Sequence, residues 1–377
     1  FHLLQEPTTK SQLPEQLILV AEDVTPSMLA EFQESGIEGI ISLSGSNNSH
    51  AAILAKAMGI PAVMGVGQVP ISQLSDIHVI VDGYSGEIFV NPDDALQNEY
   101  LHLLTEERQL QAKVDKVAGL PAITPDKKSV EVVLNAGLLL DYERSSEVGA
   151  VGIGLYRTEI PFMNRSSFPT ETEQTLWYSD VLKAFPRKTV TMRTLDVGGD
   201  KSLPYFPIQE DNPFLGWRGI RITLDHPEIF LVQVRAMLRA NIGQGNLEIM
   251  LPMVSGVTEV EDAIRLINQA YFELKSEYDE PLVKPKVGIM VEVPATIYQL
   301  DDLAKKVDFF SVGSNDLTQY LLAVDRNNAR VAQLYDSYHP AVLRALNHIA
   351  SEAQRHLVPL SLCGELAGDP AGALLLM

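Results

Sequence analysis

The chain has very little cysteine: Cys363 is the only one among 377 residues. One cysteine excludes an intramolecular disulfide and is typical of a reducing compartment, so we expect a cytoplasmic location. Long apolar runs are also missing, because none approaches the roughly 20 residues that a membrane-spanning helix needs. The first residues are not a secretory signal and lack an initiator Met, which predicts an internal fragment with no membrane association.

Positive charge is the second shortage. Lys and Arg number 29 against 49 Asp and Glu, for a formal net charge of −20. Such a balance argues against non-specific binding to nucleic acid, which is itself a polyanion. An anionic substrate would need a local cluster of arginines and a metal ion. The 46% hydrophobic and 21% charged composition is typical of a folded protein, and the length suits two domains.

Two regions of different composition precede residue 121. Residues 1–91 alternate short strand and helix patterns and end in a predicted hairpin around Gly83 and Gly86. Residues 92–120 contain a stretch without Gly or Pro whose apolar positions recur at three and four, which predicts a long amphipathic linker helix. We therefore expect a small mixed α/β domain, a connecting helix and a second domain over 121–377.

Strand and helix patterns alternate throughout residues 121–377. About seven strands are visible, at 129–135, 149–156, 189–196, 247–253, 286–294, 308–317 and 359–363. Repeated βα units predict a parallel sheet with right-handed crossovers, either open or closed. A closed eight-stranded barrel would need one strand more, so we expect truncation before the last strand.

Two of these strands end on carboxylates. Glu292 follows an apolar run that begins at Lys286, and Asn315-Asp316 follows the next run. In a barrel of this kind, carboxylates after successive strands lie at the same rim. Mg²⁺ is usually held by one or two carboxylates together with substrate phosphate. The pattern predicts a metal-dependent enzyme that acts on a phosphorylated anion.

Four arginines follow strand ends: Arg157, Arg193, Arg218 and Arg326. The guanidinium group matches the oxygens of phosphate and carboxylate in a bidentate manner. A single arginine is more often a structural ion pair, but four after barrel strands favour an anion site. By contrast, the segment Gly198-Gly199-Asp200-Lys201 lacks the rest of a phosphate-loop pattern, and we interpret it only as a flexible loop at the rim.

His50 and Cys363 are the candidate reactive residues. His50 begins a predicted helix that ends at Gly59, where free N–H groups and the helix dipole suit transient negative charge, as on a phosphohistidine. A His that only hydrogen-bonds near the cap is an equally good interpretation. Cys363 ends its strand, and a buried inert thiol is the default. With an ordinary pKa near 8.5 it could act as an acid towards a carbanion-like carbon as readily as a nucleophile.

Taken together, these segments resemble a known family. The context of His50 and the motifs Arg-Thr-Glu, Asn-Pro-Phe-Leu-Gly-Trp-Arg, Val-Glu-Val-Pro, Gly-Ser-Asn-Asp-Leu-Thr and Cys-Gly-Glu, in this order, are similar to those of the PEP-utilising enzymes. Within that family the chain resembles enzyme I, the phosphoenolpyruvate–protein phosphotransferases of the sugar phosphotransferase system, or their nitrogen-branch variant. The likeness extends over nearly the whole chain from about Gln16.

The resemblance implies a swivelling phosphohistidine α/β domain followed by a (β/α)8 TIM-barrel domain that binds phosphoenolpyruvate (PEP). It implies phosphoryl transfer from PEP to the chain and on to a histidine phosphocarrier protein, with release of pyruvate and homodimerisation through the barrel. The implied roles are phosphorylation of His50, protonation of the enolpyruvate C3 by Cys363, Mg²⁺ ligation by Glu292 and Asp316, and PEP binding by Arg157, Arg193, Arg218, Asn315, Asp316 and Arg326.

Three departures from the family pattern stand out. Asn47 and Asn48 precede Ser49-His50 where the family more often has Gly-Gly-x-Thr-Ser-His, so contacts around the phosphohistidine are expected to differ. No helical insert for docking the carrier precedes His50, which puts transfer to the carrier in question. Loss of the last strand puts barrel closure, PEP binding and the dimer contacts in question.

Two alternatives remain open at this stage. Pyruvate,phosphate dikinase and PEP synthase share the phosphohistidine domain and the PEP barrel but add an ATP-binding domain, of which the sequence shows no Gly-rich nucleotide loop. A catalytically silent PEP sensor is the other alternative, and the presence of His50, Cys363, Glu292 and Asp316 argues against it.

Overall fold

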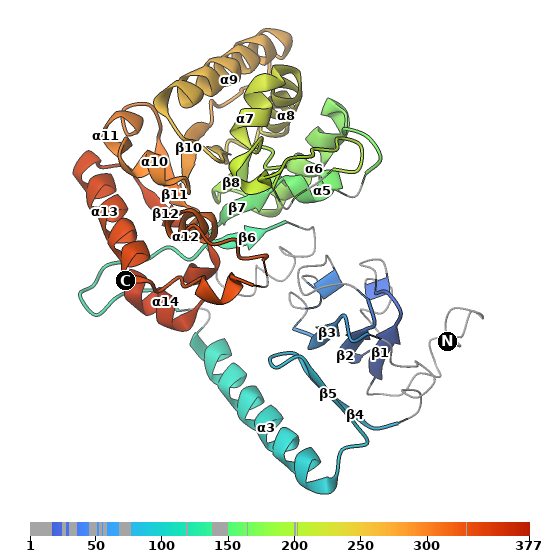
Figure 1. Ribbon diagram of the computed structural model, residues 1–377. Helices are drawn as coiled ribbons and strands as arrows, with labels where there is room; N and C mark the ends of the chain where they lie inside the picture. The colour runs from blue at the N-terminus through green and yellow to red at the C-terminus, as the bar shows by residue number, and fades with distance from the viewer. Residues whose placement is uncertain are drawn as a thin grey trace. The chain divides into compact units, whose positions relative to one another are not determined.

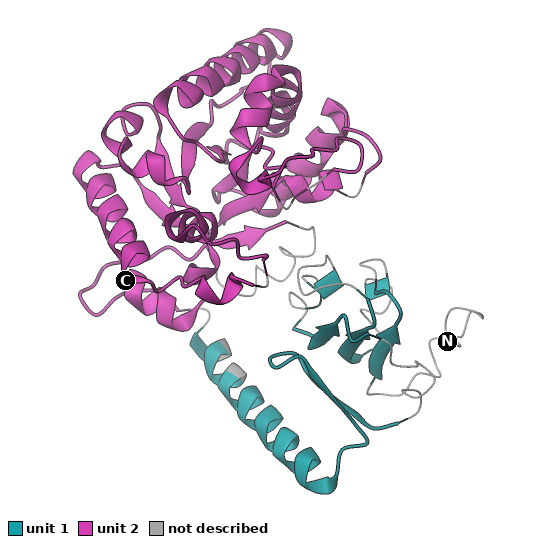
Figure 2. Cartoon of the chain, viewed as in Figure 1, with its two compact units in different colours: residues 1–118 teal, residues 119–377 magenta. Residues whose placement is uncertain are grey.

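The computed structural model describes residues 17–24, 28–29, 36–44, 51–52, 55, 59–67, 77–117, 120–137, 150–163, 165–199, 201, 203–328 and 330–377. The chain divides into two compact units, residues 1–118 and residues 119–377 (Figure 2). His50 lies outside the described residues, as do most residues of the helix predicted after it.

The first unit contains a small parallel sheet and a hairpin. Strands β1 (Leu17–Ala21), β2 (Ile37–Ser42) and β3 (Ala62–Met64) are hydrogen-bonded in that order and run parallel. Strands β4 (Val79–Asp82) and β5 (Glu87–Val90) pair antiparallel, which confirms the predicted hairpin.

Helix α3 (Asp94–Val117) is the predicted amphipathic helix, and one side of it meets the hairpin. The Tyr100 ring lies 5.6 Å from that of Phe89, and its hydroxyl donates to Asp82 Oδ2 at 3.0 Å. Other apolar side chains on the helix, such as Leu101 and Leu110, are exposed. The hairpin therefore covers only part of the apolar surface of α3.

The second unit is built on a parallel sheet of seven strands that curls on itself (Figure 1). Its strands are β6 (Leu134–Ala136), β7 (Ile153–Arg157), β8 (Val190–Arg193), β9 (Leu247–Leu251), β10 (Lys286–Val291), β11 (Phe309–Val312) and β12 (Leu360–Leu362). Each strand pairs with the next one in the chain, in the order β6 to β12. This is the predicted alternation of strands and helices, in a TIM-barrel-like sheet.

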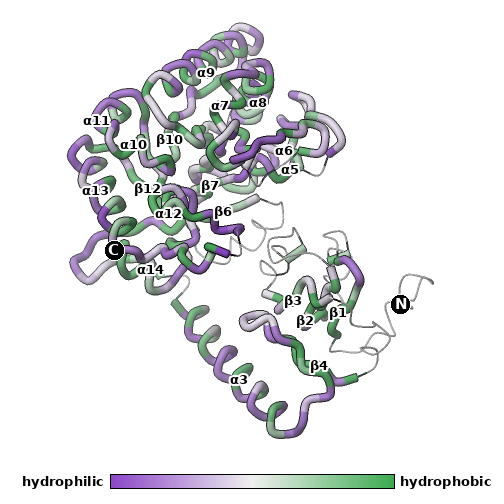
Figure 3. The backbone as a smooth tube through the Cα atoms, viewed as in Figure 1, coloured by the Kyte–Doolittle hydropathy of each residue, from purple (hydrophilic) through white to green (hydrophobic). Residues whose placement is uncertain are grey.

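Helices lie between the strands and after the last strand, and the longer ones cover the outer face of the sheet (Figure 1). They are α5 (Glu159–Met163), α6 (Glu171–Ala184), α7 (Ile220–Asp225), α8 (Pro227–Ala240), α9 (Val257–Glu277), α10 (Pro294–Ile297), α11 (Leu300–Leu303), α12 (Ser314–Leu322), α13 (Pro340–His356) and α14 (Pro370–Leu376). Short 3-10 turns lie at Pro213–Leu215, Ala332–Leu334 and Glu365–Ala367. In Figure 3, α9 and α13 show both hydrophilic and hydrophobic stretches, as amphipathic helices do.

The alternation of side chains along a strand decides which residues reach the interior of the curl. In β10, Ile289 and Val291 belong to the large core that includes the helices, whereas Met290 belongs to a separate small core with Leu155, Met250 and Phe309. Because alternate side chains point to opposite faces, the residue that follows Val291 shares the face of Met290. That residue is Glu292.

Among the described residues, no helix is both long enough and apolar enough to cross a membrane.

Candidate active site

Strands β7 and β8 each end on an arginine, and Arg157 and Arg193 are register partners. Both bind the same carboxylate: Arg157 Nε lies 3.2 Å and Arg193 Nη2 lies 2.6 Å from Glu159 Oε1. Glu159 is fully buried at the start of α5. Burial alone would raise its pKa, but the cations Arg193, Lys201 and Arg157 lower the pKa of Glu159 to about 2.

Asp196 is a second buried carboxylate, three residues after Arg193. Its Oδ2 atom lies 3.2 Å from Arg193 Nη2 and pairs with Lys201 Nζ, and its Oδ1 atom accepts a 3.0 Å hydrogen bond from Arg218 Nε. Burial opposes its ionisation, but Arg218, Lys201 and Arg193 hold the pKa of Asp196 well below its usual range. Both carboxylates are therefore anionic at neutral pH.

Arg218 is fully buried and links Asp196 to Asp316. Besides its bonds to Asp196, its Nη1 and Nη2 atoms donate to Asp316 Oδ1 and Oδ2 at 2.9 and 3.3 Å. The chain turns tightly around this side chain: a Cβ at Gly198, where φ is +101°, would lie 2.4 Å from the Trp217 carbonyl oxygen. Only glycine combines that conformation with that close approach.

Glu292 is fully buried, with one oxygen bonded and the other free. Its Oε1 atom accepts a 2.6 Å hydrogen bond from the backbone N–H of Met253, whereas Oε2 has no hydrogen-bond partner among the described residues. Burial, together with the negative charges of Asp316 and Asp196, raises the pKa of Glu292 to about 7. A Cβ at Gly313 would lie 2.8 Å from Oε2, so the glycine keeps the space beside the free oxygen open.

Asn315 and Asp316 lie in the first turn of α12, directly after β11. Burial raises the pKa of Asp316, but the guanidinium groups of Arg218 and Arg326 lower it below its ordinary value. Asn315 Oδ1 accepts a 2.9 Å hydrogen bond from the backbone N–H of Glu365. The start of α12 is thereby tied to the segment after β12.

Cys363 directly follows β12 and packs against the small inner core. Its thiol donates to the Val312 carbonyl oxygen at 3.4 Å, and its own carbonyl accepts a 2.8 Å hydrogen bond from Asn135 Nδ2 of β6. Burial raises the pKa of the thiol to about 11, which keeps it protonated at neutral pH. Among the two roles left open by the sequence, these surroundings favour the acid.

The structure links most of the residues singled out in the sequence. Arg157, Arg193, Arg218 and Asp316 form one chain of ion pairs through Glu159 and Asp196. Glu292, Arg326 and Cys363 interact electrostatically with members of that chain. The cluster is mixed in charge, with five cations against four carboxylates: Arg157, Arg193, Lys201, Arg218, Arg326 and Glu159, Asp196, Glu292, Asp316. His50 lies outside the described residues.

Sequence reasoning missed Lys201, Glu159 and Asp196. Lys201 belongs to the segment that the sequence predicts to be only a rim loop. In the structure its Nζ atom pairs with Asp196 Oδ2 and lies 3.7 Å from Glu159 Oε1. The two carboxylates follow Arg157 and Arg193 by two and three residues, and that short spacing was the available signal.

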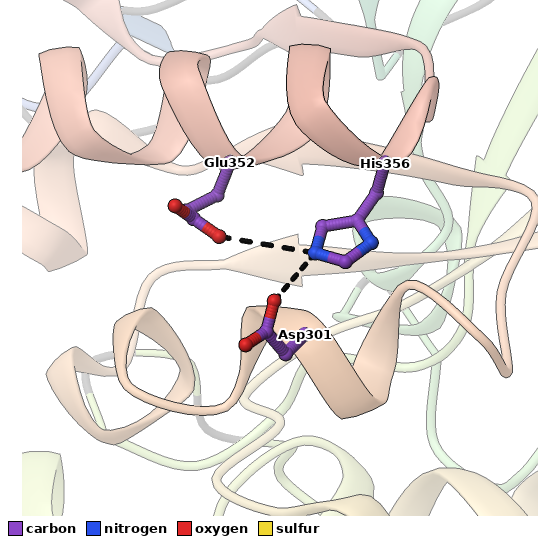
Figure 4. Close-up of side chains that lie close together, drawn as sticks. All are labelled: Asp301, Glu352 and His356. Atoms are coloured by element: carbon purple, nitrogen blue, oxygen red, sulfur yellow. Dashed lines mark hydrogen bonds and ion pairs between the residues drawn. The ribbon is translucent and has the colours of Figure 1, made fainter.

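A second charged cluster lies on α11 and α13, where Asp301, Glu352 and His356 point toward one another (Figure 4). His356 Nε2 is 2.5 Å from Asp301 Oδ1 and 3.8 Å from Glu352 Oε2. Arg355 pairs with both carboxylates, and the side chains of Arg355 and Asp301 are exposed, so these contacts are those of an ordinary surface ion-pair cluster. We therefore assign this cluster a structural role, in joining α11 to α13.

The fold and the site define a class of protein: a TIM-barrel-like α/β unit with a cluster of arginines and carboxylates at the carboxyl ends of its strands. Two family models match the chain, the PEP-utilising enzyme mobile domain over residues 13–86 and the PEP-utilising enzyme PEP-binding domain over residues 111–377. The chain therefore belongs to the PEP-utilising enzyme family.

Curated relatives agree with this assignment. A protein from Escherichia coli (strain K12) named "Phosphoenolpyruvate-dependent phosphotransferase system" is 53% identical over 98% of this chain and 49% of its own length. A Staphylococcus carnosus "Phosphoenolpyruvate-protein phosphotransferase" is 40% identical over 97% of this chain and 64% of its own length. The chain thus spans about half to two thirds of the length of these relatives.

Solved structures add little. The structure described as "N-terminal domain of Enzyme 1 - Nitrogen" is 40% identical over 25% of this chain and 39% of that chain, with a TM-score of 0.22. A HpcH/HpaI aldolase/citrate lyase family protein from Burkholderia cenocepacia J2315 is 15% identical over 70% of this chain and 87% of that chain, with a TM-score of 0.41. Neither superposition is close enough to inform the site.

The ion pairs of Glu159 predict an acid-sensitive step in stability. Its pKa is lowered from 4.5 to about 2 on folding, so its stabilising contribution is complete above pH 4.5 and is lost as the pH falls through about 2. The contribution is on the order of 3 kcal/mol. In urea unfolding at several pH values, the unfolding free energy of Glu159→Gln should decrease less than that of the unaltered chain as the pH falls from 4.5 to about 2. Equal slopes for both proteins would contradict the assignment.

Removal of Asp196 should destabilise the second unit strongly. Among the described residues, Asp196→Asn leaves the buried Arg218 with Asp316 as its one remaining ion-pair partner. Breaking a buried ion pair costs about 3–5 kcal/mol. The control is Glu273→Gln, which removes one of three carboxylates around the partly exposed Arg235 and should cost less than about 1 kcal/mol. Chemical denaturation measures both, and equal losses would refute the expectation.

Proposed function

We propose that the chain transfers the phosphoryl group of PEP to its own His50 and then to a histidine phosphocarrier protein, with release of pyruvate. The observation that best supports this is the clustering of Arg193, Arg218, Glu292 and Asp316 at the carboxyl ends of the strands, within the region matched by the PEP-binding domain. The names of the relatives from Escherichia coli and Staphylococcus carnosus fit the same reaction.

The carboxylates fit a magnesium ion. Glu292 Oε2 is a buried oxygen without a hydrogen-bond partner among the described residues, and Asp316 is the neighbouring negative charge that most strongly affects its pKa. Such hard oxygen ligands are those that Mg²⁺ prefers. Glu292 and Asp316 would hold the ion, which when bound would neutralise charge on the phosphate oxygens.

The cations of the cluster suit the substrate. PEP combines a carboxylate with a phosphate group that bears about −1.5 to −2 charges at neutral pH. In our proposal Arg157, Arg193, Arg218 and Arg326 bind these groups together with Asn315 and Asp316, and Lys201 adds a further positive charge. Their hydrogen bonds would steady the charge that spreads over the phosphoryl oxygens during transfer.

The proposed reaction breaks the bond between phosphorus and the enol oxygen of PEP and forms a bond between phosphorus and a ring nitrogen of His50. The electron pair left on the enolate moves to C3, which takes a proton from the Cys363 thiol and gives pyruvate. Because burial raises the pKa of Cys363, the thiol bears its proton at neutral pH and has one to give.

The domain assignment belongs to the same proposal. Residues 1–91 would form the phosphohistidine domain, residues 92–120 the linker helix, and residues 121–377 the PEP-binding domain, of the (β/α)8 barrel type. A swivelling motion would bring His50 to the PEP site. Homodimerisation through the barrel and a cytoplasmic location complete the proposal.

Phosphorylation of His50 is the direct test. On incubation with labelled PEP and Mg²⁺, the chain should gain one acid-labile, alkali-stable phosphoryl group, measured by intact mass and label retention. His50→Ala should gain none, because no imidazole is available to accept the group. The control His78→Ala, in the same unit, should be phosphorylated normally. Binding of PEP without any phosphorylation would indicate a silent sensor instead.

The acid role of Cys363 makes a separate prediction. Cys363→Ala should lose pyruvate formation by a factor of about 100 or more while PEP affinity changes little, because general acid catalysis contributes about 10²–10⁴-fold. A coupled pyruvate assay and calorimetric titration with PEP and Mg²⁺ measure the two quantities. Unchanged turnover in Cys363→Ala would remove the acid role.

A further inference from the structure

Gln233 of α8 is a buried neutral side chain that bonds to the ends of both arginine-bearing strands. It is 1% exposed. Its Oε1 atom accepts a 2.8 Å hydrogen bond from the backbone N–H of Leu195, and its Nε2 atom donates to Thr158 Oγ1 at 3.0 Å. Leu195 directly precedes Asp196, and Thr158 lies between Arg157 and Glu159. One amide thus contacts both chain segments from which the charged cluster projects.

The hydrogen bonds around Gln233 have a single consistent direction. Because the backbone N–H of Leu195 can only donate, the atom facing it must be the amide oxygen, and the other atom is the donor. The second donation goes to Tyr178 Oη at 3.2 Å, so that every hydrogen-bonding group of the amide is used. Thr158 Oγ1 in turn donates to the Arg193 carbonyl at 2.7 Å. The network fixes the orientation of the amide.

The strand pairing itself provides little support at this point. The ladder between β7 and β8 has an irregular register between Ile153 and Tyr156, and its last pair is Arg157 with Arg193. At that last pair, the Arg193 carbonyl accepts its hydrogen bond from the side chain of Thr158, through Oγ1. Where the backbone ladder between the two strands ends, the side chains of Gln233 and Thr158 therefore provide the hydrogen bonds that connect them.

We propose that Gln233 is a positioning residue of the PEP site, which holds the ends of β7 and β8 so that Glu159 and Asp196 keep the arginines in their reactive placement. This rests on the function proposed above. Gln233 acts through Thr158 and Leu195 and does not touch the substrate. Phosphoryl transfer requires close alignment, and misplacement of a group by about 1 Å can cost roughly 100-fold in rate.

Gln174 of α6 provides a matched control. It is likewise buried, at 2% exposed, and likewise bonds to Tyr178, whose hydroxyl donates to Gln174 Oε1 at 3.1 Å. Its other hydrogen bond goes to the Pro169 carbonyl and not to a strand end. Gln233→Met and Gln174→Met therefore remove similar buried amides, of which only one is tied to the site.

The first measurement is steady-state turnover with PEP, Mg²⁺ and a histidine phosphocarrier protein as the phosphoryl acceptor, beside the unfolding temperature. Both variants should unfold at a lower temperature, since each leaves buried polar groups without partners. Gln233→Met alone should lower kcat by about 10- to 100-fold with a change in KM of less than about threefold, because alignment for transfer is more demanding than ionic attraction. Thr158→Val should reproduce the loss, and the two losses should not add in the double variant.

The second measurement does not depend on PEP. Glu159 faces Arg157, Arg193 and Lys201, with the anionic Asp196 nearby. If Gln233 keeps these groups in place, the unfolding free energy of Gln233→Met should decrease less between pH 4.5 and 2 than that of the unaltered chain. The unfolding free energy of Gln174→Met should decrease as much as that of the unaltered chain. Urea unfolding in that pH range gives the comparison.

The outcomes separate the two proposals. The positioning role is supported if Gln233→Met, unlike Gln174→Met, has a lower kcat and also a smaller decrease in unfolding free energy between pH 4.5 and 2. Equal effects of Gln233→Met and Gln174→Met, or none in either, would overturn it. If the unaltered chain is never phosphorylated by PEP, the proposed function fails. The decrease in unfolding free energy between pH 4.5 and 2 then decides by itself whether Gln233 positions the charged groups.

Discussion

The buried guanidinium of Arg218 is the constraint on which the site depends. It has no contact with water and bonds to a carboxylate on each side, Asp196 after β8 and Asp316 at the start of α12. A charge in such a place is tolerated only when it is paired and hydrogen-bonded. Because the two carboxylates follow strands that are separated by β9 and β10, the bonds of this one side chain fix the distance between the ends of β8 and β11.

From Arg218 and its two carboxylates, a series of alternating positive and negative side chains continues along the ends of the strands. Asp196 also pairs with Arg193, Arg193 with Glu159, and Glu159 with Arg157. Each shared carboxylate makes the position of one cation depend on the next, so Arg157, Arg193 and Arg218 form one unit and not three separate contacts. Such a connected network holds its members more rigidly than isolated surface ion pairs do.

The same network leaves some buried groups unsatisfied. Glu159 Oε2, Arg193 Nε and Glu292 Oε2 have no hydrogen-bond partners among the described residues. Buried polar groups of this kind are costly to a folded protein and are characteristic of sites that a ligand completes. A phosphorylated anion with its magnesium ion would supply an acceptor for the guanidinium and a cation for the carboxylates, as the proposed function requires.

The sequence by itself determined the order of strands and helices and the residues that follow the strands. Buried β-branched runs and amphipathic helices are local patterns, so β9, β10, β11 and α8 could be placed from them. Glu292, Asp316, Arg157 and Arg193 followed from the same reasoning, since residues after parallel strands share one rim. Only the tertiary structure decided how these groups pair. Contacts between segments that are far apart in the sequence give importance to Glu159, Asp196, Lys201 and Gln233. No local sequence pattern encodes which charged residues from distant segments will pair. Burial then converts those contacts into the pKa shifts and the rigidity of the site, because a charge that has lost water depends on its neighbours alone.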